Sequence, residues 1–126
     1  MTLTPCTLII PVADLQHAGA WFSDCLGFHA DHMGGTGVRL SRDAAVIHLV
    51  QAGDDMDMDD PRRQQSVYIS LEDVDAFYAG HKSALDTGGT RVRAPFDRDY
   101  GMRELHVIYE SLLMFFGAPI SKDSKL

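Results

Sequence analysis

The chain contains few cysteines and no long apolar run. Its 126 residues include two cysteines, Cys6 and Cys25, without the paired spacing of a zinc site or a disulfide framework. Both lie in apolar sequence, so we expect buried thiols in a reducing compartment. No stretch approaches the ~20 apolar residues of a membrane span, and the first residues lack the basic and apolar regions of a secretion signal. These absences predict a cytoplasmic protein that does not bind membranes.

Basic side chains are also scarce. There are 11 Lys and Arg residues against 18 Asp and Glu residues, which gives a formal net charge of -7. This balance argues against a nucleic-acid partner, because such affinity comes from cations that neutralise phosphates. It favours a cationic ligand instead. The terminal residues Ser124, Lys125 and Leu126 match a peroxisomal address, which applies only in a eukaryotic host.

The two halves of the chain share one pattern of elements. A strand over 7–12 precedes a helix capped by Asp14 and ended by Gly27, and a strand over 66–71 precedes a helix capped by Asp73 and ended by Gly88-Gly89. Three short strands follow each helix. We expect them at about 28–32, 37–41 and 45–51 in the first half, and at about 90–93, 102–108 and 112–117 in the second. The repetition predicts a duplicated βαβββ unit.

This pattern divides a single domain over 1–126 into two modules. The first module spans 1–52 and the second spans 66–118, with a tail over 119–126. The segment "GDDMDMDDPRRQQ" over 53–65 separates them. A calcium loop starting at Asp55 would need Gly and Glu where Asp60 and Ser66 stand. We therefore interpret 53–65 as a solvated acidic linker.

Three segments carry a family resemblance. "IIPVADLQHAGAWFSDCLGF", "VYISLEDVDAFYAGHKSALDTGG" and "DYGMRELHV" resemble segments of the vicinal oxygen chelate superfamily, which includes glyoxalase I, extradiol dioxygenases, fosfomycin-resistance enzymes and bleomycin-resistance proteins. The last segment resembles the bleomycin-resistance-like branch. The resemblance implies an α+β fold in which two tandem βαβββ modules form a cupped mixed sheet with helices on the outer face. It also implies a homodimer with clefts between subunits.

The sequence departs from the family before its last strand. The usual Asp-Pro-Asp-Gly-Asn turn is replaced by a shorter segment in "VIYESLLMFFG". Glu110 and Ser111 must then make a tighter hairpin turn. The register of the last strand depends on this turn, because a slip of one residue moves every side chain to the other face.

The metal ligands of the family have few counterparts here. By resemblance, the four positions fall on Thr7, His48, Ser66 and Phe115. Only His48 is a strong ligand, and a phenyl ring at 115 would obstruct a metal. We therefore predict that the usual metal site is absent and that the protein needs no cofactor. An alternative, a relocated site built from His48, Glu104 and His106, is less favoured because His48 should lie a strand or more away.

Strand alternation places a second set of side chains inside the cup. Leu105 and Val107 should pack on a helix, so Glu104 and His106 should face a ligand cleft. We assign no catalytic residue. The predicted ligand contacts are apolar from Tyr68, Met102 and Phe115, and polar from His48, Glu104 and His106. Glu104 is the carboxylate expected to pair with a ligand cation.

The favoured function is metal-independent sequestration of a cationic or amphipathic ligand, such as a cationic glycopeptide drug, in the manner of bleomycin-resistance proteins. Such antibiotic resistance would come from ligand binding in a homodimer, without catalysis. The alternative is a lyase or dioxygenase-type enzyme with an atypical metal site, in which His48 or Glu104 is the general base. A third hypothesis, an unknown metabolite as ligand, also stays open.

Overall fold

The computed structural model describes residues 1–120 and divides the chain into two compact units, Met1–Met58 and Asp59–Leu126. The boundary between the units falls inside the segment 53–65. Ser124, Lys125 and Leu126 lie outside the described residues. No helix in the described part of the chain is long and apolar enough to cross a membrane.

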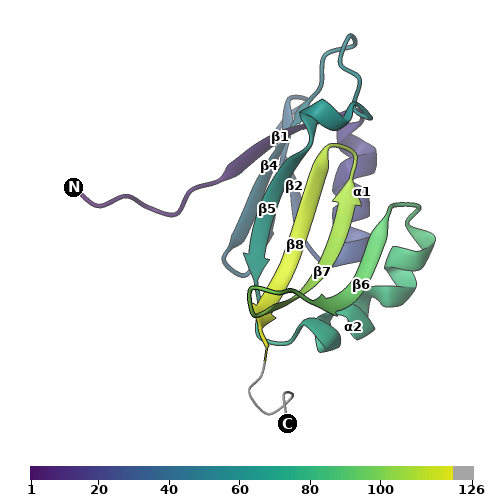
Figure 1. Ribbon diagram of the computed structural model, residues 1–126. Helices are drawn as coiled ribbons and strands as arrows, with labels where there is room; N and C mark the ends of the chain where they lie inside the picture. The colour runs from purple at the N-terminus through teal and green to yellow at the C-terminus, as the bar shows by residue number, and fades with distance from the viewer. Residues whose placement is uncertain (121–126) are drawn as a thin grey trace. The chain divides into compact units, whose positions relative to one another are not determined.

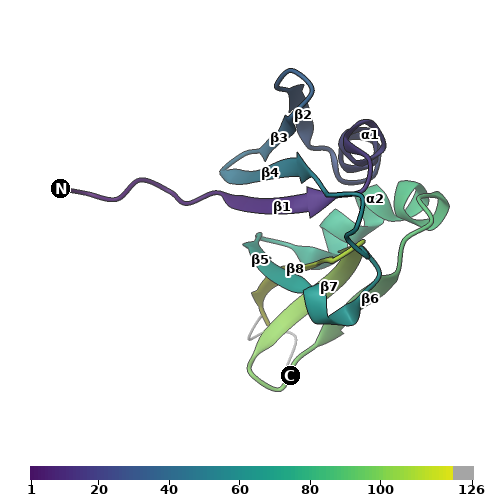
Figure 2. The same ribbon diagram turned by 90° about the horizontal axis from the view of Figure 1, so that it is seen from above.

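The first unit is a βαβββ module (Figure 1). It contains β1 (Leu8–Val12), α1 (Leu15–Leu26), β2 (His29–His32), β3 (Gly37–Arg42) and β4 (Ala45–Gln51). The four strands form one sheet in the order β1-β4-β3-β2. β1 and β4 are parallel, and the other two pairs are antiparallel. α1 packs against β2, β3 and β4, on one face of this sheet (Figure 2).

The second unit repeats the same topology. A short 3-10 helix, η1 (Pro61–Arg63), precedes β5 (Gln65–Ser70), α2 (Val74–Thr87), β6 (Val92–Asp97), β7 (Met102–Tyr109) and β8 (Leu112–Pro119). The sheet order is β5-β8-β7-β6, with β5 and β8 parallel. α2 packs against β6, β7 and β8. The prediction of an α+β fold built from two tandem βαβββ modules with mixed sheets is confirmed.

Aspartate caps begin both helices, as the sequence predicts. The side chain of Asp14 accepts a hydrogen bond from the backbone N–H of His17 at 3.0 Å, and Asp73 accepts one from Ala76 at 3.0 Å. Gly27 ends α1 in the left-handed conformation, with φ 69°, and its N–H donates to the carbonyl of Ser23 at 3.2 Å. Each cap satisfies backbone groups that the helix itself leaves unpaired.

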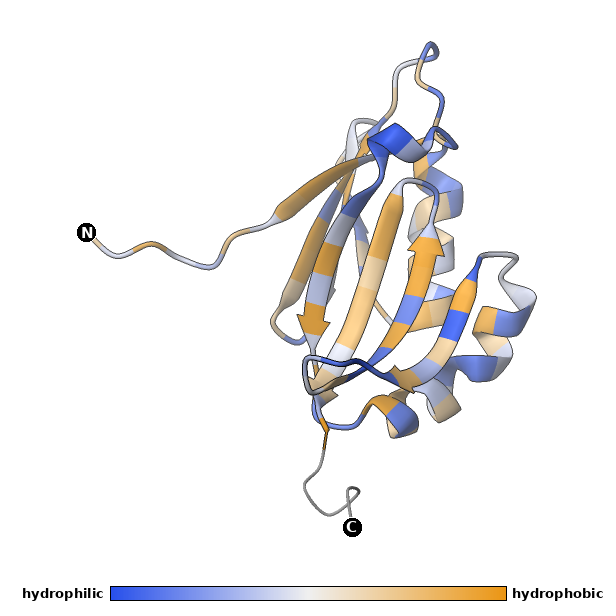
Figure 3. Cartoon of the chain, viewed as in Figure 1, coloured by the Kyte–Doolittle hydropathy of each residue, from blue (hydrophilic) through white to orange (hydrophobic). Residues whose placement is uncertain are grey.

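The core of each module lies between its helix and the facing side of its sheet. Apolar side chains alternate along the strands, so one side of each sheet meets the helix. In the second module, which we call module 2, β8 is apolar along most of its length. β7 instead alternates between polar and apolar residues (Figure 3). The buried core residues of the two modules include Ile10, Phe22, Leu26, Leu40, Ile47 and Leu49, and Leu85, Leu105, Val107, Leu112, Met114 and Phe116.

The predicted tight turn between the last two strands is confirmed. Tyr109 pairs with Leu112, so Glu110 and Ser111 alone connect β7 to β8. Glu110 has φ 50°, and positive φ values suit two-residue hairpins because they match the strand twist. This turn fixes the register in which His106 pairs with Phe115.

Two expectations from the sequence are wrong. Cys6 is exposed, because it precedes β1 and no element covers it. The strand expected at 90–93 is β6, which runs from Val92 to Asp97. β6 continues through Pro95 because it is an edge strand, where a proline costs no ladder hydrogen bond.

The left-handed cap at Gly27 generates a prediction about stability. Replacing Gly27 with alanine should lower the free energy of unfolding by about 1 kcal/mol, because a Cβ is disfavoured at positive φ. Urea unfolding measures the difference. Gly35→Ala is the matched control, since open space surrounds that position and its φ is not positive. Equal stability of the two variants would contradict the argument.

Candidate functional site

Two rows of side chains cross the sheet of module 2 on the side away from α2. The strand pairings align Tyr68, Phe115, His106 and Arg93 in the first row. They align Ser70, Gly117, Glu104 and Phe96 in the second. Arg98 and Tyr100 approach from the loop between β6 and β7. We call these ten residues the Glu104 face.

Aromatic rings pack along the first row. The imidazole of His106 stacks on the phenyl ring of Phe115, with centroids 4.2 Å apart and planes 11° apart. Tyr68 meets Phe115 edge-on at 5.9 Å, and Phe96 meets His106 edge-on at 4.9 Å. The structure therefore brings together four of the six predicted contact residues, Tyr68, Glu104, His106 and Phe115.

Glu104 is the buried polar centre of this face. Its side chain is 0% exposed. The hydroxyl of Tyr100 donates to Oε2 at 2.5 Å, and the guanidinium of Arg98 approaches Oε1 at 3.4 Å. Nε2 of His106 lies 2.8 Å from Oε1, and since an ionised carboxylate only accepts hydrogen bonds, this nitrogen must carry the proton. Both carboxylate oxygens of Glu104 therefore already accept hydrogen bonds from within the protein.

The surroundings of Glu104 keep it ionised. Burial raises the pKa of its carboxyl, but hydrogen bonds from Tyr100, His106 and Tyr68, together with the charge of Arg98, outweigh burial and lower the pKa below its ordinary value. The same carboxylate acts on its neighbours. Burial and the hydrogen bond to Glu104 raise the pKa of Tyr68 to about 12. The hydroxyl of Tyr68 therefore stays protonated at neutral pH.

Tyr68 reaches Glu104 by crossing β8 at Gly117. A Cβ built on Gly117 would overlap the Tyr68 hydroxyl. Only glycine leaves room for the ring, because the approach is far closer than van der Waals contact allows. Gly117 belongs to the site, and the sequence analysis missed it.

A bulge in β6 adds two further residues that the sequence analysis missed. Arg93 pairs with His106 and Phe96 with Glu104, so two residues, Ala94 and Pro95, stand opposite Leu105. The strand therefore has one residue more than its partner at this point, which changes the direction of the following side chains. As a result, Arg93 and Phe96 lie on the same face of the sheet. The guanidinium of Arg93 lies 3.6 Å from the centroid of the Phe96 ring. The proline inside the segment "VRAPFD" was the available sequence clue, because a proline within a strand is found at edges and bulges.

The remaining two predicted contact residues, His48 and Met102, are not among the ten residues of the Glu104 face. His48 lies on β4 of module 1, where its ring packs over Gly37, at which a Cβ would lie 2.7 Å from Nε2. Met102 begins β7, half-buried, and shares the side of Glu104 by alternation. The roles of all six residues in ligand binding stay predictions.

The residues do not fit the metal site of the family. By the family resemblance, the corresponding positions in the second module are Ser66 and Phe115, and Phe115 is packed between His106 and Tyr68. Among residues 1–120 there is no group of three or more His, Cys, Asp or Glu side chains arranged to hold a metal ion. Ser66 and Phe115 are not residues that hold a metal ion strongly, so these positions do not support a metal-dependent reaction.

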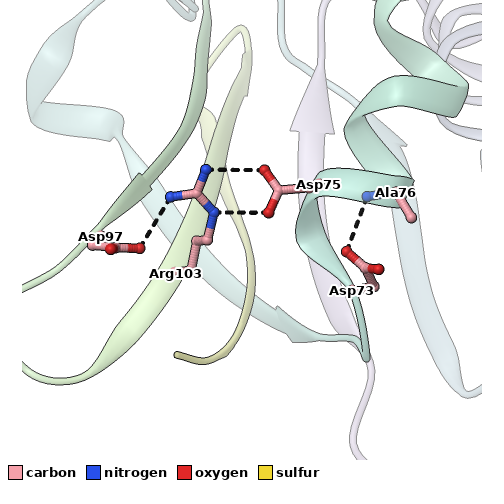
Figure 4. Close-up of polar contacts among 5 residues, drawn as sticks. All are labelled: Asp73, Asp75, Ala76, Asp97 and Arg103. Atoms are coloured by element: carbon pink, nitrogen blue, oxygen red, sulfur yellow. Dashed lines mark hydrogen bonds and ion pairs between the residues drawn. The ribbon is translucent and has the colours of Figure 1, made fainter. Parts of the chain in front are cut away.

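The helix side of the same sheet carries a separate polar cluster. The guanidinium of Arg103 donates two hydrogen bonds to Asp75, both at 2.9 Å, and one to Asp97 at 3.0 Å (Figure 4). These bonds join the first turn of α2 to β6 and β7. A depression of about 450 Å³ lies here, lined by Asp75, Asp97, Arg103 and their neighbours. Since each of the three guanidinium nitrogens of Arg103 donates to a carboxylate, we interpret the cluster as structural.

The model of the Glyoxalase/Bleomycin resistance protein/Dioxygenase superfamily matches residues 3–116. No curated protein sequence matches the chain.

Several solved structures share the fold. A bleomycin resistance determinant encoded on the transposon Tn5 has a TM-score of 0.78 and 18% identity, covering 94% of this chain and 100% of that one. The bleomycin-binding protein of Streptomyces verticillus, complexed with copper(II)-bleomycin, has a TM-score of 0.74 and 19% identity, with 92% and 96% covered. The fosfomycin resistance protein FosX of Mesorhizobium loti has a TM-score of 0.66 and 10% identity, with 100% of both chains covered. At these identities, the likeness establishes the fold.

The buried carboxylate predicts a pH-dependent stability. Glu104→Gln should lower the free energy of unfolding at pH 7 by roughly 1 to 3 kcal/mol, because it weakens hydrogen bonds to a buried charge. The pKa of Glu104 is lower in the folded state than the ordinary value of about 4.3. Its stabilisation is therefore present above that value and lost as pH falls through the folded pKa.

Urea unfolding of both proteins at pH 7 and near pH 3 tests this expectation. The difference between them should shrink at the lower pH. Glu72→Gln is the matched control, because it makes the same change at an exposed position and should have little effect at either pH. A constant difference would contradict the assigned ionisation of Glu104.

The glycine under Tyr68 predicts a change in tyrosine titration. Gly117→Ala should push the Tyr68 hydroxyl away from Glu104, so its pKa should fall from about 12 towards the ordinary value near 10. Alkaline titration of tyrosine absorbance measures this shift, with Tyr68→Phe identifying the contribution of Tyr68. Gly80→Ala, where a Cβ meets nothing within 4 Å, should leave the titration unchanged. If a tyrosine with this raised pKa persists in Gly117→Ala, the contact between Tyr68 and Glu104 is refuted.

Proposed function

The chain belongs to the Glyoxalase/Bleomycin resistance protein/Dioxygenase superfamily, and on that premise we propose that it is a metal-independent small-molecule binding protein of the bleomycin-resistance type. One observation carries the proposal. The Glu104 face presents packed rings around a fully hydrogen-bonded carboxylate, with Tyr68 41% and Tyr100 53% exposed. Aromatic surface with a few fixed polar groups is what small-molecule sites offer.

The hydrogen bonding of Glu104 bears on how such a ligand would bind. Both carboxylate oxygens already have partners. A ligand cation would have to displace one of them, and an unpaired buried donor is costly. An amphipathic ligand that stacks on the rings leaves these bonds intact. Bleomycin-binding proteins share this fold, which supports a small-molecule ligand.

The proposal includes a homodimer that acts in the cytoplasm. The family resemblance supports the dimer, because clefts of small members form between paired subunits. The two cysteines support a reducing compartment, since they form no disulfide. Sedimentation velocity measures the oligomeric state directly, and a monomer at micromolar concentration would contradict the proposed homodimer.

A second candidate function, an enzyme of the same superfamily, rests on the Glu104–His106 pair. A histidine whose one ring nitrogen donates to a buried carboxylate has its other nitrogen as an acceptor when the ring is neutral. This is the arrangement of an oriented general base. Mass spectrometry of a ligand after prolonged incubation separates the two functions. An unchanged ligand mass supports binding alone, and a new mass supports the enzyme.

The proposed binding predicts the effect of changing Phe115. The purified protein should contain no stoichiometric metal by elemental analysis, and metal-free bleomycin should raise its melting temperature, because a ligand of the native state stabilises it. Phe115→Leu keeps apolar volume but removes the ring that stacks on His106. It should weaken binding by about tenfold or more, as expected for a central aromatic contact.

Isothermal titration calorimetry with bleomycin measures the loss of affinity in Phe115→Leu. Tyr78→Leu is the matched control, because it replaces a ring on α2, on the other side of the sheet, and should bind as the wild type does. Near-stoichiometric metal, or equal weakening by both variants, would count against the proposal.

A further inference from the structure

Arg93 is a cation without an anion on the Glu104 face. Its side chain is exposed, and its guanidinium lies 3.6 Å from the centroid of the Phe96 ring. Among residues 1–120, this ring contact is made without any hydrogen bond or ion pair from the Arg93 side chain. The cation–π contact holds the group in place without neutralising it. Its five N–H donors are therefore available to a ligand.

A second guanidinium stands beside the same ring. Arg98 lies 5.5 Å from the Phe96 centroid and 5.0 Å from that of Tyr100. Its single contact with Glu104, at 3.4 Å, uses one Nη1 donor, and its side chain is 32% exposed. Two like charges on one ring repel each other, because a half-exposed surface screens them only in part. An oxyanion between or beside them would relieve this repulsion.

The charge of this face therefore opposes the charge of the whole chain. The chain carries a formal charge of -7. The Glu104 face carries one carboxylate, which is buried and hydrogen-bonded, and two guanidiniums that reach solvent. Even with a neutral imidazole at His106, the accessible charge is positive. Net charge governs the approach of a ligand, but the local groups decide what binds.

We infer that the Glu104 face binds an aromatic ring that carries an oxyanion, with Arg93 as the residue that pairs with the oxyanion. The ring stacks on the surface formed by Tyr68, His106 and Phe115. The oxyanion receives charge-assisted hydrogen bonds from the planar guanidinium fork of Arg93, which matches a carboxylate in geometry. Arg98 adds to the attraction while keeping its contact with Glu104. The inference rests on the proposed binding function and specifies its ligand class.

Three matched probes test the ligand class. 2-Naphthoate, 2-naphthamide and 2-(aminomethyl)naphthalene share one ring system and differ in charge. Isothermal titration calorimetry on the full chain should give the tightest binding for 2-naphthoate, by about tenfold over the neutral amide, as expected for a hydrogen bond to a charged group. The cationic probe should bind most weakly. The preference for 2-naphthoate should fall as ionic strength rises, because salt screens exposed charge.

Variants of Arg93 test the assigned residue. Arg93→Gln should remove the preference for 2-naphthoate and leave binding of the amide within about twofold, while Arg93→Lys should keep part of the preference, because a point charge lacks the fork. Arg63→Gln is the matched control, since it removes the same charge from an exposed position on η1. It should leave the preference unchanged. Circular dichroism spectra that match the wild type confirm that each variant is folded.

Failure of the oxyanion inference can be distinguished from failure of the proposed binding function. Equal binding of the three probes, preference for the cationic probe, or a preference that survives Arg93→Gln would overturn the inference about the oxyanion. If bleomycin still binds in that case, the proposed function stands without it. If neither bleomycin nor any probe binds, both the inference and the proposed function are wrong.

Discussion

A buried carboxylate must be surrounded by donors, and this requirement governs the sheet of module 2. Moving an unpaired carboxylate out of water costs several kcal/mol, so Glu104 is compatible with folding only while Tyr100, His106 and Arg98 supply hydrogen bonds. The bond from His106 orients its ring, and that ring stacks on Phe115. One polar residue thus fixes the position of the aromatic surface around it.

The rest of the module is arranged so that these partners can reach Glu104. Gly117 leaves space for Tyr68, and the bulge in the edge strand β6 moves Phe96 to the same face as Glu104. Both devices sit on a four-stranded sheet backed by α2. A site built on strands holds its geometry better than one built on loops, which suits a face whose side chains must stack closely.

This fold supports binding proteins and enzymes alike, so the residues on the sheet decide the function. By the family resemblance, Ser66 and Phe115 stand where two metal ligands are expected, and the nearby carboxylate of Glu104 accepts hydrogen bonds from Tyr100 and His106. What the face offers outward is ring surface, a tyrosine hydroxyl and two guanidiniums. In the proposed function these groups recognise a ligand by stacking and charge, and we infer an anionic group on that ligand where the net charge of the chain suggested a cationic one.

The sequence by itself determined the order of elements, both helix caps and the tight turn at Glu110, because these depend on local periodicity and on single residues such as Asp14, Gly27 and Asp73. Strand alternation also placed Glu104 and His106 on one side of β7. Only the tertiary structure decided that Glu104 is buried and saturated, since its partners come from two other segments of the chain. It alone added Arg93 and Phe96, because a bulge reverses the alternation from which sequence reasoning proceeds, and it alone placed Tyr68 over Gly117, a contact between strands far apart in the sequence.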